Sequence, residues 1–173
     1  MTSRNTFVRS MHDLGLATWF GGSLMGAVGL NGATAQAHDP SERLRLSSLG
    51  WARWTPVTIA AVGAHTIGSL GLIAGNSARL AHQPEARSNT TVKTVLTVAA
   101  AGVSLYSGIL GAKIAKHATE GSQGATEPGT SSSDELAGVQ RQQKVLQWAI
   151  PALTGVLVVL GAQQGEQQRP LAE

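Results

Sequence analysis

Two histidines are the side chains of this sequence with the clearest capacity for chemistry. His12 lies in the stretch Met11-His12-Asp13 at the start of a long apolar run, and His65 lies in the middle of a second run. An imidazole ring can bind a metal ion or a haem iron, and it titrates near neutral pH. With Asp13 or Met25 beside it, His12 is therefore a candidate haem or metal ligand. A histidine at the membrane interface, capped by a neighbouring loop, is the plainer interpretation.

The predicted depths of the histidines argue against a haem shared between two of them. The second apolar run would cross antiparallel to the first, which places His65 about 13 residues, or roughly 20 Å, from the side where His12 enters. His117 follows the third run, about 20 Å from His65 on the other side. Because two axial ligands of one haem need nearly the same depth, we expect no such pair, and a haem on one ligand is the alternative. A mid-span histidine can otherwise be satisfied by a single carbonyl or hydroxyl.

Four apolar runs must position these side chains, at about residues 13–36, 56–78, 93–113 and 146–163. At about 1.5 Å of rise per residue, such runs cross the roughly 30 Å hydrocarbon core of a bilayer. Charged residues make up only 13% of the chain, against about 25% in globular proteins. The sequence therefore predicts an all-α fold, an integral membrane four-helix bundle forming one domain over residues 1–173. We expect a multi-pass protein of a bacterial cell (plasma) membrane.

Small residues recur along each run at steps of three and four, so they share one face of each predicted helix. Glycine costs about 1 kcal/mol relative to alanine in a water-exposed helix, but inside a bilayer it lets two helices approach closely. These seams favour membrane helices over the soluble bundle that a mean hydropathy of +0.03 would allow. The predicted helix-packing residues are Gly15, Gly22, Gly26, Gly29, Ala61, Ala64, Gly68, Gly71, Gly75, Ser104, Gly108, Gly111 and Gly155.

Tryptophan and arginine flank the runs, as is typical of residues at a membrane–water interface. The segment 39–55 mixes both with leucine, so we expect it to lie at the membrane surface. A cap at Asp39 would begin this segment, and Pro56 would restart a helix after it. The residues predicted at the interface are Trp51, Arg53, Trp54 and Trp148.

The two remaining polar segments are predicted to lie outside the membrane. Residues 119–133 are of low complexity, rich in Ser, Gly and Thr, and we expect a mobile loop. Ser132 and Glu135 offer a capping box for the helix that follows. Residues 164–173 form a Gln-rich polar tail.

Composition and motifs narrow the function. The chain has no cysteine, which excludes thiol ligands and disulfides. Its basic residues are spread between the runs, so nucleic acid is not an expected partner. No nucleophile motif, HExxH or phosphate-binding loop is present, which favours a protein that is not an enzyme. We expect a structural or accessory subunit that packs against other membrane proteins or itself, with no cofactor. The alternative is a haem- or metal-linked redox or transport protein that uses His12 and His65.

One stretch also carries a family resemblance. The pattern His-x-x-Gly-x-x-x-Trp-Phe-Gly-Gly over residues 12–22, together with the junction at residues 51–56, resembles uncharacterised four-span membrane proteins of high-GC Gram-positive bacteria. That likeness covers residues 10–115 and implies no activity. More loosely, the first helix is similar to copper-resistance D-type membrane proteins and to the membrane protoporphyrinogen oxidase. In that oxidase a histidine of the N-terminal helix holds haem, and His12 is the one matching position, so its activity is not carried over.

Overall fold

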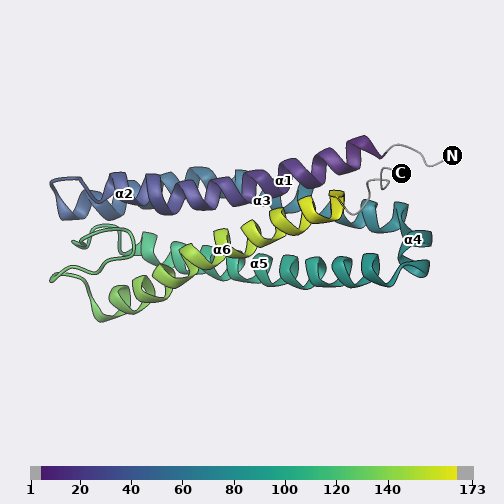
Figure 1. Ribbon diagram of the computed structural model, residues 1–173. Coiled ribbons are helices and arrows are strands. Elements are labelled where there is room, and N and C mark those ends of the chain that lie inside the picture. The colour runs from purple at the N-terminus through teal and green to yellow at the C-terminus, as the bar shows by residue number, and fades with distance from the viewer. Residues whose placement is uncertain (1–4, 167–173) are drawn as a thin grey trace.

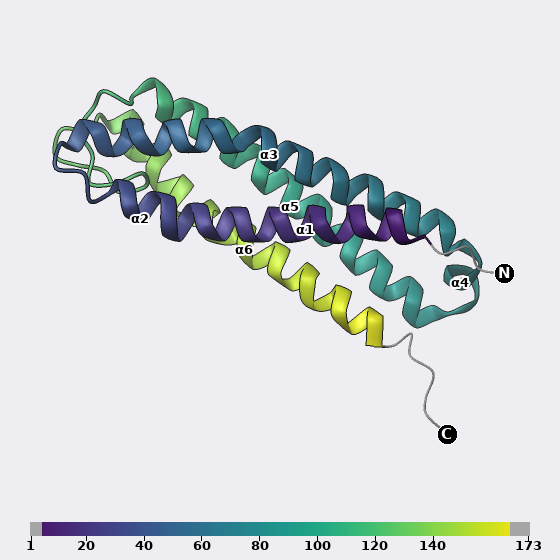
Figure 2. The same ribbon diagram turned by 90° about the horizontal axis from the view of Figure 1, so that it is seen from above.

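The computed structural model describes residues 5–166, and the last part of the predicted polar tail, residues 167–173, lies outside that range. Helices dominate the described chain, and they are antiparallel rods lying side by side (Figures 1 and 2). Contacts link α1 to α3, α3 to α5, α5 to α6 and α6 to α1, so the long helices form a closed ring. The helical elements are α1 (Thr6–Met25), η1 (Gly26–Leu30), α2 (Asn31–Thr34), α3 (Pro40–Gly75), α4 (Ser77–His82), α5 (Pro84–Lys116) and α6 (Asp134–Glu166).

Helices α1 and α3 pack through glycines, as the seams predicted. A Cβ atom on Gly68 would lie 2.5 Å from the backbone nitrogen of His12, and one on Gly15 would lie 2.5 Å from that of His65. Neither backbone can move aside locally, so both positions require glycine. Other predicted seam residues support the same hairpin: Gly22 faces Trp54, Gly26 faces Trp51, Gly71 faces Val8, Gly75 faces Asn5 and Ala61 is buried.

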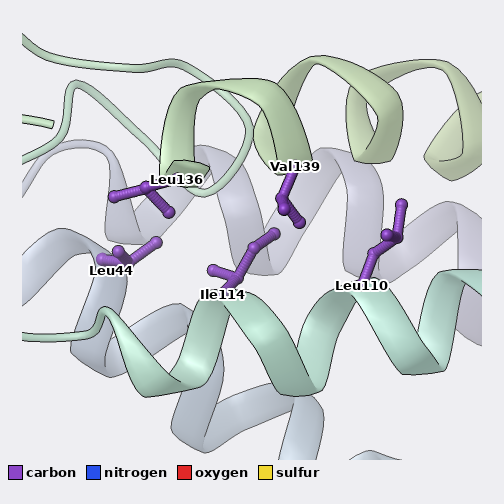
Figure 3. Packing of buried hydrophobic residues seen from close by; sticks show 5 residues of the cluster. All are labelled: Leu44, Leu110, Ile114, Leu136 and Val139. Atoms are coloured by element: carbon purple, nitrogen blue, oxygen red, sulfur yellow. The ribbon is translucent and has the colours of Figure 1, made fainter. Parts of the chain in front are cut away.

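The seam predicted on α5 holds only in its first half. Ser104 accepts a hydrogen bond from the indole of Trp19 (3.1 Å), but a Cβ atom on Gly108 or Gly111 would contact nothing within 4 Å. The helices are spaced there by larger side chains, which point toward one another from α3, α5 and α6 (Figure 3). Gly108 and Gly111 therefore do not pack inside the described structure. The cluster consists of Leu44, Leu110, Ile114, Leu136 and Val139.

Three further predicted packing residues have weaker contacts. A Cβ on Gly29 would meet only the side chain of Met25, in its own helical path, at 3.3 Å. Ala64 is half-buried on α3. On α6, a Cβ on Gly155 would lie 3.3 Å from the ring of Phe20, so this glycine does face α1.

Helix α3 corrects the prediction of a separate surface segment at 39–55. Asp39 caps the helix by accepting from the Ser41 amide at 2.8 Å, as expected, but the helix then continues through Pro56 to Gly75. Pro56 removes one backbone donor without ending the helix. The carbonyl that loses its helical donor at Pro56 is that of Ala52, and one position earlier the Thr55 hydroxyl donates to the carbonyl of Trp51 (2.8 Å). Residues 39–55 are thus the first half of a long helix.

Large apolar side chains cover much of the outer surface, and several polar side chains are buried beside the apolar clusters of the interior. Large apolar side chains point outward on every long helix, with exposed fractions of 77% for Phe7, 67% for Ile59 and 69% for Leu105. Polar side chains such as Gln140 and Thr154 are fully buried. Among the described residues, α3, α5 and α6 are long and apolar enough to cross a membrane. The successive helical elements α1, η1 and α2 are not among these three helices.

The loop that we expected to be mobile lies folded over the end of the helices. Residues 122 and 128 form an isolated β-bridge, and the buried side chain of Gln140 donates to the carbonyls of Gly124 (3.0 Å) and Ala125 (3.2 Å). The following helix is capped by Ser133, one residue after the predicted cap, because its hydroxyl accepts from the Leu136 amide at 3.2 Å. The low-complexity composition thus forms a packed cap.

Candidate functional site

A partly open cavity of about 510 Å³ is lined by residues near the start of α1, the end of α6 and α4. Figures 1 and 2 show that these three segments lie at the same end of the rods. Helices α1, α3, α4, α5 and α6 all contribute to its wall. Small-molecule sites typically have volumes of roughly 300 to 1,000 Å³ and lie between helices or domains. The cavity is therefore large enough for a ligand, and both candidate histidines line it.

The structure corrects the predicted separation of these histidines. The rings of His12 and His65 are in contact, with centroids 4.4 Å apart and a tilt of 42° between their planes. The expected distance of roughly 20 Å assumed that the first helix starts near residue 13. Instead α1 starts at Thr6 and α3 ends at Gly75. His12 is therefore about one helical turn from His65 along the hairpin, opposite Gly68.

His65 is held on both sides of its ring. Nδ1 lies 3.2 Å from the carbonyl oxygen of His12, and because a carbonyl only accepts, Nδ1 must carry the proton. Nε2 then accepts from the hydroxyl of Thr97 on α5 at 3.3 Å. The side chain of His65 is 1% exposed, and Trp19 approaches its ring edge-on at 6.1 Å. This histidine ties α1, α3 and α5 together and has no ring nitrogen left for a ligand.

His12 differs, since one of its ring nitrogens is free. The Nδ1–H group donates a hydrogen bond to a carboxylate oxygen of Asp13 at 2.7 Å. Within the described chain, Nε2 makes no hydrogen bond. A carboxylate that fixes one imidazole nitrogen and leaves the other facing a cavity is the arrangement found around many metal-binding histidines. His12 is therefore the chemically available member of the pair.

The cavity carries an excess of positive charge. Its charged lining residues are Arg9, Asp13, Arg79 and Lys93. Lys93 donates to the amide oxygen of Gln164 (3.2 Å), a neutral partner. None of the three cations forms a salt bridge with a residue of the described range 5–166. Three positive groups thus face a single carboxylate, and that carboxylate is already engaged by His12.

Comparison with protein-family models, with curated proteins and with solved structures gives no match. The family resemblances seen in the sequence therefore stay predictions. What the site can do must be argued from its own geometry.

That geometry can be tested against a metal or a haem. Within residues 5–166, no three His, Cys, Asp or Glu side chains are grouped so that they could hold a metal ion. Two histidines that sandwich a haem lie on opposite faces of the porphyrin, so rings in mutual contact cannot do so. The residues fit only a haem bound through one ligand, Nε2 of His12, with Asp13 as its orienting group.

A second polar cluster lies at the opposite end of the structure. The side chain of Asn31 donates to Gln147 on α6 (3.0 Å), and its oxygen accepts from Ser47 (3.0 Å) and from the indole of Trp51 (2.9 Å). Gln147 donates onward to Thr126 in the folded loop (3.2 Å). Both the amide nitrogen and the amide oxygen of the Asn31 side chain are thus hydrogen-bonded. The cluster links α2, α3, α6 and the loop to one another.

The residues predicted at the interface take different places. Trp51 and Trp54 are half-buried and lie over Gly26 of η1 and Gly22 of α1. Arg53 is exposed, and Trp148 is 50% exposed. Sequence reasoning missed Lys93 and Gln147, which start the third and fourth apolar runs. In the sequence, a polar residue at the start of an apolar run is indistinguishable from a residue at the membrane interface. In the structure, α5 begins at Pro84 and α6 at Asp134, so Lys93 and Gln147 lie within the helices and not at their ends.

Proposed function

We propose that this chain is a multi-pass integral membrane protein of the plasma membrane that spans the bilayer four times. Three of its helices are long and apolar enough, and the α1–η1–α2 path would supply the fourth crossing. Exposed apolar side chains on all four rods, around buried polar groups, support this proposal, because lipid is the medium that favours such a distribution.

Within the membrane, its proposed function is to bind a small ligand in the cavity beside His12, without catalysis. The observation that carries this function is the cavity itself. A partly open space of about 510 Å³ lies where five helices meet. It is lined by His12, whose Nε2 makes no hydrogen bond within the described residues, and by cations that lack a salt-bridge partner there. A structural seam between helices would be expected to close such a space with side chains.

Filling the cavity tests this function. Ala17 lines the cavity, and Ala99 is an exposed residue of α5 that does not. We expect Ala17→Trp to remove any small molecule that co-purifies with the protein in mild detergent, as detected by mass spectrometry of the denatured sample. Ala99→Trp, the matched control, should retain it. Identical small-molecule content in the two variants would overturn the proposal.

A haem-linked redox or transport protein is the second candidate, favoured by the Asp13–His12 hydrogen bond. His12 would hold the iron, and the haem would supply one-electron chemistry. His65 would position His12 without ligating, since both its ring nitrogens are occupied. This candidate predicts a Soret band in purified protein that is lost in His12→Ala and kept in His65→Ala. A colourless preparation contradicts it.

An accessory or self-associating role is supported by a different observation. Gly108 and Gly111 contact nothing within the described chain, although glycines in membrane helices commonly mark close helix contacts. A helix of a second copy would give them that contact. Because the chain has no cysteine, Gly108→Cys should cross-link two copies under oxidation more than Ile109→Cys does, one position around the helix. Equal cross-linking in both variants contradicts this role.

A further inference from the structure

The cations of the cavity have no counter-ion among the described residues. Arg9, Arg79 and Lys93 come from three different helices, α1, α4 and α5, and converge on one space. With Asp13 as the single lining carboxylate, the formal charge is three minus one, or +2. Arg79 and Lys93 are partly buried, and Arg9 is exposed. Like charges held around one partly open cavity repel one another, and a bound anion relieves that repulsion. The electrostatics thus favour a ligand with a negatively charged group.

The rest of the cavity wall is apolar. Leu16 of α1, Ile73 of α3, Val98 of α5 and Val158 of α6 line it. The cations and the apolar side chains belong to the same cavity, so a bound molecule would touch both. A free inorganic anion would leave the apolar wall unused, and a neutral hydrocarbon would leave the cations unpaired. A molecule with an anionic head and an apolar body satisfies both parts.

We propose that this cavity binds a single-chain amphiphile with an anionic headgroup, a fatty carboxylate or a phosphate monoester of a lipid chain. The headgroup lies among Arg9, Arg79 and Lys93, and the chain lies along Leu16 and Val98. This inference rests on the proposed ligand-binding function and names its ligand class. Charge-assisted hydrogen bonds from lysine and arginine to carboxylate or phosphate supply the selectivity.

A brominated probe can locate such a ligand, because bromine quenches nearby tryptophan fluorescence. Trp19 is the reporter: it is 2% exposed and lies 6.1 Å from the ring of His65, which lines the cavity. Trp51 and Trp54 pack against Gly26 and Gly22, farther along the hairpin. The full chain in dodecyl maltoside would be titrated with dibromostearate, with a brominated alkyl phosphate and with a neutral brominated monoacylglycerol. A Trp19→Phe variant identifies the reporter's share of the signal.

We expect both anionic probes to quench Trp19 saturably and the neutral probe to quench it at least about tenfold more weakly. Lys93→Gln should weaken the anionic probes by about tenfold. Lys113→Gln, an exposed cation at the far end of the same helix, should leave them unchanged. A preference for one anionic probe distinguishes carboxylate from phosphate as the headgroup within the proposed class.

Two results would overturn the inference, and they have different meanings. If the neutral probe quenches Trp19 as strongly as the anionic probes, and Lys93→Gln has no effect, the cavity binds amphiphiles but the anionic class is wrong. If no probe quenches Trp19 in the wild-type chain while the other tryptophans respond to the micelle, the ligand-binding function itself fails.

Discussion

Single glycines set the distance between α1 and α3. Gly15 and Gly68 each lie against backbone atoms of the opposite helix, and those atoms belong to His65 and His12. The same close approach lets the two imidazole rings touch and gives Nδ1 of His65 its acceptor. The candidate site therefore depends on residues that have no side chain.

The first prediction concerns Gly68. In Gly68→Ala, the added methyl group would lie 2.5 Å from the His12 backbone nitrogen, so the helices must separate. We expect a destabilisation of about 1 to 3 kcal/mol, typical of overpacking a tight interface. Thermal denaturation of the detergent-solubilised protein, followed by size-exclusion chromatography, measures this loss.

Gly63→Ala is the matched control for that change. The same methyl group, on another face of α3, would meet nothing within 4 Å. Its stability should equal or slightly exceed that of the wild-type chain, since alanine is the better helix former. Equal stability of the two alanine variants would contradict a tight backbone contact between α1 and α3.

Among the elements, the folded loop before α6 is stabilised by one carboxylate. Glu120 accepts from the Ser133 amide (2.8 Å) and from a ring nitrogen of His117 (2.6 Å). These hydrogen bonds, the Ser133 amide first, hold the pKa of Glu120 below its ordinary value of 4.5. Glu120 thus joins the end of α5 to the start of α6.

A pH dependence follows from that lowered pKa. Folding favours the deprotonated form of Glu120, so its contribution is complete above pH 4.5 and is lost as the pH falls below it. Hydrogen exchange of the Ser133 amide, corrected for its intrinsic pH dependence, should accelerate on acidification from pH 6 to 3.5. Glu120→Gln should exchange faster already at pH 6, whereas Glu135→Gln, a 71% exposed carboxylate, should not. Exchange that is flat with pH in the wild-type chain would contradict the prediction.

The seams of α1 and α3 could be predicted from spacing because glycine at steps of three and four has a direct geometric meaning. The depth of His65 could not. Hydropathy marks only where charged residues interrupt an apolar run, whereas α1 continues past Arg9 and α3 ends before residue 78. His12 therefore lies opposite Gly68, three residues from His65 and not thirteen, a difference of nearly three helical turns. The prediction for α5 was wrong at Gly108 and Gly111 for a different reason. Small residues occupy more than one face of that helix, and their spacing does not show which face packs against another helix.

At the scale of the whole molecule, the two ends of the rods differ in character. One end holds α4 and the cationic cavity, and the other holds the folded loop and the Asn31 cluster (Figure 1). In a protein that crosses the membrane four times, these ends face opposite sides. Basic residues occur at both ends, so the positive-inside rule does not assign them to the cytoplasm or the exterior.

Cysteine labelling tests this topology. The chain contains no cysteine, so Gln83→Cys, beside α4, and Ser131→Cys, in the folded loop, are each unique labels, and both positions are exposed. A membrane-impermeant maleimide added to intact cells should label one of the two, and permeabilisation should be needed for the other. Labelling of both variants in intact cells would contradict four crossings.

The π-helical turn η1 (Gly26–Leu30) sets the orientation of the residues that follow it relative to α1. Such a turn accommodates one residue more than an α-helical turn, and each residue of an α-helix rotates the chain by about 100°. Deleting one residue there would restore a regular helix but would swing Asn31 away from Ser47 and Trp51 if α1 stayed in place. The extra residue in this turn changes the rotation of the following residues about the helix axis. One continuous helical path can therefore place glycines against α3 at one end and Asn31 against Ser47 and Trp51 at the other.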